Sequence, residues 1–324
     1  MRYGYEHSIL GEEDYIQFHY QFNIFSFLAI VNLIYGIPSI IILIKMSYFY
    51  CIHQKKPNPN GPHPAIFRQF IVMQAMCVCH VTIRLLTFRI PLTGLMTSWC
   101  ASEEPMSTLQ LFVFMNTGVA YGKYISIILF CFLRVVLLFS LDHVTEKIGR
   151  LLAYLSPLFI IFAFLLALPR FFTLSTCAQL GWPFPHGAII IRTFIDHSSS
   201  VTPSALIIGF FVQPLTVLTV FTLVVLMFKK LRDKKRINST RKANKKAERV
   251  LSATMIFLLF PVIVNYSIAL FEFFDLINTI SYIVHYISLD AQAHVITWYF
   301  YCTHPIFKKK VARKLVVKAV STSK

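Results

Sequence analysis

Seven long apolar runs constrain this sequence more than any other feature. Each run holds roughly 20 or more mostly apolar residues, the length that a helix needs to cross about 30 Å of hydrocarbon. Lipid offers no partner to unpaired backbone groups, and no run alternates as a barrel strand does, so each run must be helical. The sequence therefore predicts an all-α membrane protein folded as a seven-transmembrane helix bundle. The predicted spans are residues 24–46, 67–89, 108–140, 151–172, 201–228, 250–274 and 277–302.

The composition agrees with lipid as the main solvent. The chain is 56% apolar and 14% charged, whereas soluble domains are about 45–50% apolar and about 25% charged. The net charge of +17 first raises the question of nucleic acid as a partner. The basic residues, however, lie between apolar runs that no nucleic-acid-binding surface could expose. We therefore exclude nucleic acid and interpret the charge as a determinant of membrane topology.

The basic residues also predict the orientation. Of the 31 Lys and Arg residues, 25 lie in the connections after the first, third and fifth runs, at their edges, or in the C-terminal segment. Such an excess marks the cytoplasmic side. We expect a multi-pass protein of the plasma membrane, divided into an extracellular segment (1–23), a transmembrane domain (24–304) and a basic cytoplasmic tail (305–324). The first run is too long for a removable signal peptide and should act as a signal anchor.

Ionisable residues within the runs are the strongest functional indication, because a charge in lipid is costly. Lys123 and Asp290 lie about 22 Å and about 20 Å from the outside, at 1.5 Å per residue. This match in depth suggests a pair across an interior cavity that binds a ligand. His294 lies one turn below Asp290, and Glu272 is placed at the cavity mouth. The pair could equally be a structural latch without ligand contact, and both interpretations stay open.

Two cysteines and two arginines lie toward the outer side. Cys100 and Cys177 fall in outer connections that face an oxidising compartment, and we predict that they pair; the alternative is two reduced residues packed under the loops. Arg84 and Arg89 are close enough to the outer surface to extend their charged ends toward it.

The inner side is predicted to hold a docking surface. Arg134 lies at the inner end of the third run, and Lys245, Lys246 and Arg249 lie just before the sixth. These residues either bind anionic lipid head groups, as in any membrane protein, or also contact an intracellular partner. Pro261, inside the sixth run, favours a kink that would let the inner end swing outward; a static kink is the equal alternative.

The sequence contains no catalytic or metal-binding pattern. It shows no metal-ligand spacing, phosphate loop or nucleophile elbow, so we expect no enzyme activity, no cofactor and no metal. Buried charge would also suit a transporter or a channel subunit. Transporters usually show internal repeats with paired broken helices, and the two halves of this chain are not similar.

Together these features resemble a G-protein-coupled receptor, with departures. The acidic residue before the span-three arginine is Leu133 here, and His304-Pro305-Ile306-Phe307 stands where Asn-Pro-x-x-Tyr would be. The departures resemble the nematode serpentine chemoreceptors, of which class gamma looks closest. The stretches that carry this resemblance are LIYGIPS at 33–39, KAERVL at 246–251 and THPIF at 303–307.

The resemblance implies a receptor that senses small external chemicals and signals through a heterotrimeric G protein. It also implies expression in sensory neurons and placement in a sensory cilium. In such a receptor, Lys123, Asp290, His294 and Glu272 would shape or line the ligand pocket, and Arg134 would face the G protein. The alternative from a different class is the membrane transporter or channel subunit.

Overall fold

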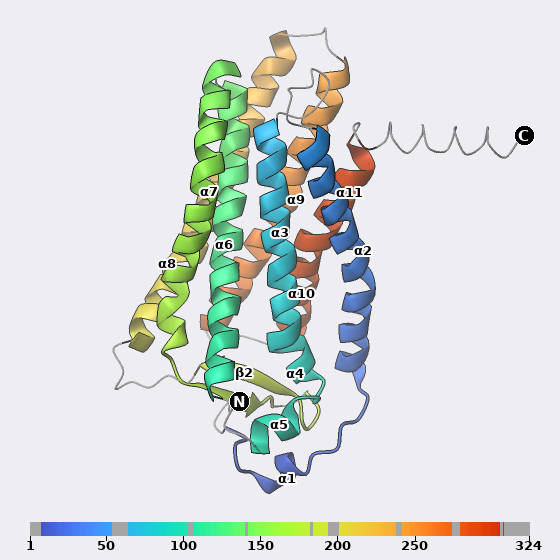
Figure 1. Cartoon of the computed structure of the whole chain (residues 1–324), viewed down its shortest axis with the longest axis vertical. Helices are drawn as coiled ribbons and strands as arrows, with labels where there is room; N and C mark the ends of the chain where they lie inside the picture. The colour runs from blue at the N-terminus through green and yellow to red at the C-terminus, as the bar shows by residue number, and fades with distance from the viewer. Residues whose placement is uncertain are drawn as a thin grey trace, which may run out of the picture.

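Long helices run side by side and form a bundle (Figure 1). The computed structural model describes residues 8–53, 64–102, 106–139, 142–181, 184–193, 201–237, 242–273, 279–304 and 307. The long helices are α2 (Ile24–His53), α3 (Pro64–Arg84), α6 (Met106–Phe139), α7 (Asp142–Phe171), α8 (Val201–Ile237) and α9 (Lys242–Phe273). The last position in the bundle is filled by three consecutive segments: α10 (Thr279–Asp290), the π-helical η2 (Ala291–Val295) and α11 (Ile296–Thr303).

The remaining elements are short and gather at one end of the bundle (Figure 1). They are α1 (Glu13–Ile16), the π-helical η1 (Leu85–Arg89), α4 (Ile90–Leu92), α5 (Thr97–Ser102) and the antiparallel strands β1 (Ser175–Gln179) and β2 (Ile189–Thr193). We call this the hairpin end. The last described residues of the chain lie at the opposite end.

The seven predicted runs lie on helices wherever the structure describes them, except for Phe172, which follows the end of α7. Five helical stretches of the described residues are long and apolar enough to cross a membrane: Ile24–Ile52, Pro64–Leu92, Ser107–Phe139, Tyr154–Phe171 and Phe211–Lys230. The sixth predicted run lies in α9, which holds the shorter apolar stretch Ser252–Val264. The seventh run coincides with α10, η2 and α11. The predicted tail, 305–324, lies outside the described residues except for Phe307.

Several helices extend beyond the runs that predicted them. Helix α8 has 37 residues, which is about 55 Å of helix against about 30 Å of hydrocarbon. Hydropathy marks only the part of a helix that lies in lipid, whereas lysine and arginine are good helix formers and continue it. The basic ends of α8 and α9 therefore extend past the apolar stretch at the opposite end.

Helix α6 is the centre of the bundle and contacts α3, α7 and α8. Two glycines allow this close packing. A Cβ atom at Gly118 would lie 2.5 Å from the ring of Phe164 on α7, and one at Gly122 would lie 2.5 Å from the Met76 methyl group on α3. Small residues of this kind let membrane helices approach closely, because lipid supplies no hydrophobic force to press them together.

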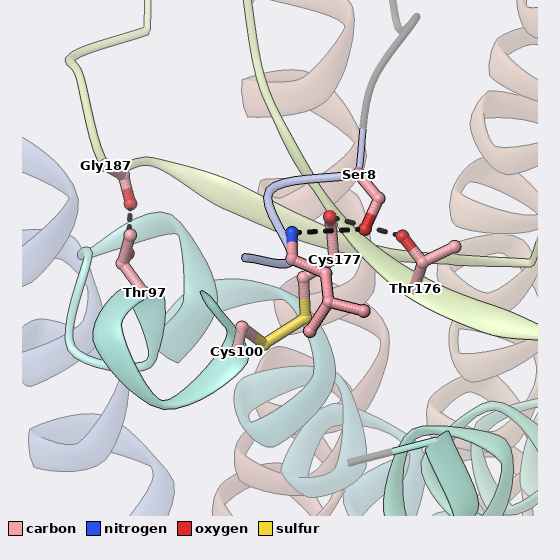
Figure 2. Close-up of a disulfide and its surroundings, with 7 residues drawn as sticks. Ser8, Thr97, Cys100, Thr176, Cys177 and Gly187 are labelled. Carbon is pink, nitrogen blue, oxygen red and sulfur yellow. Dashed lines mark hydrogen bonds between the residues drawn. A yellow bond between two sulfur atoms is a disulfide. The ribbon is translucent and has the colours of Figure 1, made fainter. Parts of the chain in front are cut away.

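A cap of three chain segments covers the hairpin end. Figure 2 shows the disulfide from Cys100 on α5 to Cys177 on β1, with Ser8 of the N-terminal segment beside it. The Ile9 amide donates to the Cys177 carbonyl at 3.1 Å, and the Thr97 hydroxyl donates to the Gly187 carbonyl at 2.6 Å. The cysteines are thus joined as the sequence led us to expect, whereas the strands and the docked N-terminal segment were not anticipated.

Candidate functional site

A partly buried carboxylate accepts hydrogen bonds from side chains of two other helical elements near the hairpin end. Asp290, the last residue of α10, accepts from Arg89 of η1 at 2.6 Å and from the Asn32 amide of α2 at 3.0 Å. The Tyr35 hydroxyl donates to its second oxygen. The Arg89 and Asp290 side chains are 9% and 16% exposed, so the ion pair is largely shielded. We call these four residues the Asp290 cluster.

Both partners of the ion pair lie at π-helical segments. Arg89 is the last residue of η1, and Asp290 is the residue immediately before η2. A π-helical turn adds a residue to the turn and rotates the side chains that follow it, and such turns are frequent at functional sites. Neither π-helical segment was apparent from the sequence, because the apolar pattern of these runs is continuous with that of an ordinary helix.

A cavity of about 240 Å³ adjoins the Asp290 cluster. Its wall is mostly apolar, and its polar side chains include those of Tyr35, Arg89 and Asp290. Leu28 of α2 and Ile287 of α10 line the cavity and are 42% and 64% exposed, so it reaches the outer surface of the bundle between these helices. The other lining residues are Phe25, Ala29, Val31, Leu92, Phe184 and Tyr286. We call it the outer cavity.

The predicted pair of Lys123 with Asp290 is not formed. Lys123 on α6 is 1% exposed, and its Nζ lies 3.3 Å from Nδ1 of His80 on α3. Asp290 instead pairs with Arg89, for which the sequence had suggested an extended, surface-seeking side chain; that expectation was also wrong. Equal depth on two helices does not make their side chains face each other, because the rotation of each helix about its axis is set by packing.

The structure describes the side chain of only one of the two remaining predicted ligand-site residues. His294 on η2 is buried and packs its ring edge-on against Tyr35, with centroids 5.0 Å apart. It therefore supports the Asp290 cluster on the side that faces away from the hairpin end. The backbone of Glu272 lies in the last turn of α9, but its side chain lies outside what the structure describes. Its predicted place at a cavity mouth remains a proposal.

The residues predicted for partner docking lie toward the opposite end. Arg134 on α6 is 1% exposed, so in this arrangement it is covered rather than presented. Lys245, Lys246 and Arg249 lie in the first turns of α9, with side chains outside the described set. The carbonyl of Pro261 accepts from the Ser288 hydroxyl of α10 at 3.4 Å, which ties the middle of α9 to α10.

Sequence reasoning missed several partners of the polar side chains. Asn32 and Tyr35 lie on one face of α2, three residues apart, and this spacing is a weak sign of a shared polar contact. His80 and Arg84 are four residues apart on α3. Their presence in an apolar run was visible, but their partners were not, since these come from other helices.

The sequence of this chain is similar to a known protein family and to a curated relative. The family model described as "Serpentine type 7TM GPCR chemoreceptor Sru" matches residues 9–310. The chain is also similar to "Serpentine receptor class U-26" of Caenorhabditis elegans, with 26% identity over 222 residues, 68% of this chain and 76% of the relative. The similarity is therefore to class U, and the class gamma that the short motifs favoured is wrong.

Proposed function

The chain belongs to the Sru family of serpentine seven-transmembrane chemoreceptors, and from that premise we propose that the outer cavity binds its chemical ligand. The family is one of chemosensory G-protein-coupled receptors, not of enzymes. It therefore supports a multi-pass membrane receptor and lends no support to the transporter or channel subunit. The family leaves open where the ligand binds, how the chain is oriented and which residues contact the G protein.

The observation that carries the proposed ligand site is the Arg89–Asp290 pair in the wall of the outer cavity. Ligand pockets are typically apolar with a few converging polar groups, and drug-sized ligands occupy about 300–1,000 Å³. A cavity of about 240 Å³ suits a smaller molecule. Nε of Arg89 is buried and has no hydrogen-bond partner among the described residues. An unmet donor beside a cavity favours a ligand with a hydrogen-bond acceptor.

The chemistry of the wall favours an apolar ligand with one acceptor group, such as a small ester, ketone or alcohol. The hydrocarbon part would contact Phe25, Leu92 and Phe184, and the acceptor would lie beside Arg89. Because the cavity reaches the surface between α2 and α10, such a molecule could also arrive through the bilayer. Lys123 and His294 do not line this cavity and would act behind or beside it, and Glu272 stays proposed at a cavity mouth.

We place the hairpin end outside the cell and the opposite end in the cytoplasm, within the plasma membrane. The distribution of Lys and Arg supports this orientation, as does the disulfide at the hairpin end. The G protein would then contact the extended basic ends of α8 and α9, including Lys245, Lys246 and Arg249. Arg134 can contact the G protein only if those ends separate from α6. A ligand drives that separation only if it binds the separated arrangement more tightly than the closed one. Placement in a sensory cilium rests on the resemblance alone.

The test is a G-protein dissociation assay in cells that express the receptor, screened against mixed volatile and water-soluble chemicals. Ala29 lines the outer cavity and is 8% exposed, whereas the adjacent Ile30 is 47% exposed toward lipid. Ala29→Trp fills the cavity, and Ile30→Trp places the same bulk at the same depth outside it. We expect at least about a tenfold loss of potency for Ala29→Trp, about 1.4 kcal/mol, and an unchanged response for Ile30→Trp.

Arg134→Ala separates binding from coupling. We expect this variant to reach the surface and bind the active chemical while losing most of the G-protein response. Equal responses from Ala29→Trp and wild type would show that the ligand binds elsewhere. A wild-type level of response in Arg134→Ala would remove the proposed role of that arginine.

A further inference from the structure

Four basic side chains meet in the interior of the bundle, apart from the outer cavity. They are Lys123 of α6, His80 and Arg84 of α3, and His285 of α10. None of the four lines the outer cavity. We call this group the basic cluster, and the proposed ligand site does not account for it.

Two short contacts hold the basic cluster together. Lys123 Nζ lies 3.3 Å from His80 Nδ1, and Arg84 Nη2 lies 2.7 Å from His285 Nε2. His80 interacts electrostatically with the other three members, and Lys123 with Arg84. The two contacts are therefore parts of one group that spans three helices.

The basic cluster has no acidic partner among the described residues. The partly buried carboxylate of Asp290 is paired with Arg89, and no described carboxylate forms an ion pair with Lys123 or Arg84. Lys123 is 1% exposed and His80 is 5% exposed. Removing a cation from water without a counter-charge is expensive, and within a membrane such residues mark function by default.

Two atoms of the basic cluster are left without partners. Nε of Arg84 and Nδ1 of His285 are both buried, and neither has a hydrogen-bond partner among the described residues. A buried donor without a partner loses its hydrogen bonds to water and gains none in return. The cluster thus combines uncompensated positive charge with unmet hydrogen-bonding capacity, and a small anion would supply both missing interactions at once.

We infer that the basic cluster is an anion site, which binds a small carboxylate between Lys123 and Arg84. The Arg84 guanidinium offers a fork of donors that matches a carboxylate, and Lys123 adds a point charge. The imidazoles of His80 and His285 orient these two cations. A carboxylate with a short hydrocarbon chain suits the apolar surroundings, and inorganic chloride would satisfy the same charge.

The experiment measures thermal unfolding of the purified full-length receptor in lipid nanodiscs at constant ionic strength. Sodium hexanoate and sodium chloride are compared in a background of sodium gluconate, whose anion is large and strongly hydrated. Hexanamide is the neutral match for hexanoate. We expect hexanoate near saturation to raise the melting temperature by at least about 3 °C, and hexanamide to leave it unchanged.

Variants of the basic cluster test whether the rise in melting temperature comes from binding at this cluster. Lys123→Gln and Arg84→Gln should each abolish it, and Lys123→Arg should retain most of it. Lys230→Gln is the matched control, because Lys230 lies over the Phe139 ring at 5.0 Å much as Lys123 lies over Tyr124 at 4.6 Å. Lys230 is on α8, far along the chain from the cluster, and its loss should leave the shift intact.

Each outcome decides the inference. A shift with chloride that follows the same variants keeps the anion site and makes an inorganic ion its occupant. Equal shifts with hexanoate and hexanamide, or none with either anion, would overturn the site even if the glutamine variants failed to fold. The readout is stability rather than signalling, so it does not depend on the proposed ligand in the outer cavity.

Discussion

The two ends of the bundle are held together by different forces. Toward the hairpin end, a few directional contacts join the helices: the Asp290 cluster, the disulfide and the hydrogen bonds of the cap. Toward the opposite end, stacked aromatic rings fill the interior, and Phe70 and Phe300 lie 4.1 Å apart between ring centroids. His304 and Phe307, from the segment that replaces Asn-Pro-x-x-Tyr, pack into the same rings. We call this the aromatic cluster.

In the proposed mechanism, this difference separates the region that binds the ligand from the region that moves. Directional polar contacts have one good geometry, so they hold a cavity and its charges in register. Aromatic packing depends on area and shape, and lipid solvates exposed apolar rings nearly as well as the protein interior does. We therefore propose that the end placed in the cytoplasm opens at modest cost, whereas the hairpin end holds the ligand.

The largest expected effect comes from breaking the buried ion pair. Asp290→Ala leaves Arg89 charged and without a counter-ion, and we expect a loss of about 3–5 kcal/mol in the free energy of unfolding. Replacing both residues by similar apolar ones, Arg89→Met with Asp290→Leu, should recover most of that loss. Thermal unfolding of the purified receptor measures both. If the double variant is as unstable as the single one, charge compensation is not what the pair provides.

A smaller effect is expected in the aromatic cluster. Phe70→Ala would leave a cavity of about 100 Å³, which at about 24 cal/mol per Å³ costs about 2 kcal/mol. The transfer contribution that adds to this cost in water is small in lipid. Phe132 on α6 is 42% exposed, so Phe132→Ala serves as the control and should be nearly neutral. A loss for Phe70→Ala that exceeds the loss for Asp290→Ala would reverse the comparison between the two ends.

The smallest effect on stability is expected from Tyr35→Phe. The change removes one hydroxyl from the Asp290 cluster and keeps the ring against His294, so about 0.6 kcal/mol should be lost, the average for a hydrogen bond between membrane helices. Because this hydroxyl also lines the outer cavity, ligand potency should fall about fivefold, as expected for one hydrogen bond of about 1 kcal/mol. Tyr48→Phe, at an exposed position of α2, is the control. An unchanged potency would place Tyr35 outside the ligand site.

Some features of the candidate site could be predicted from local chemistry. Asp290 stood out because a carboxylate in an apolar run must find a partner, and the two outer cysteines stood out because of the compartment they face. The partner of Asp290 could not be predicted, since Lys123 and Arg89 were both available cations. The π-helical segments beside Arg89 and Asp290 rotate the side chains by amounts that no hydropathy pattern contains.

The formation of membrane-spanning helices follows from the amino-acid sequence alone. Lengths of apolar runs, the distribution of Lys and Arg, and the cost of a charge in lipid are properties of single segments, so they can be inferred one segment at a time. Three further features are apparent only from the packed structure: Asp290 meets Arg89, Lys123 joins a basic cluster, and the N-terminal segment docks on a hairpin. These contacts depend on how each helix is rotated against its neighbours, because two side chains meet only where the packed surfaces of their helices bring them together.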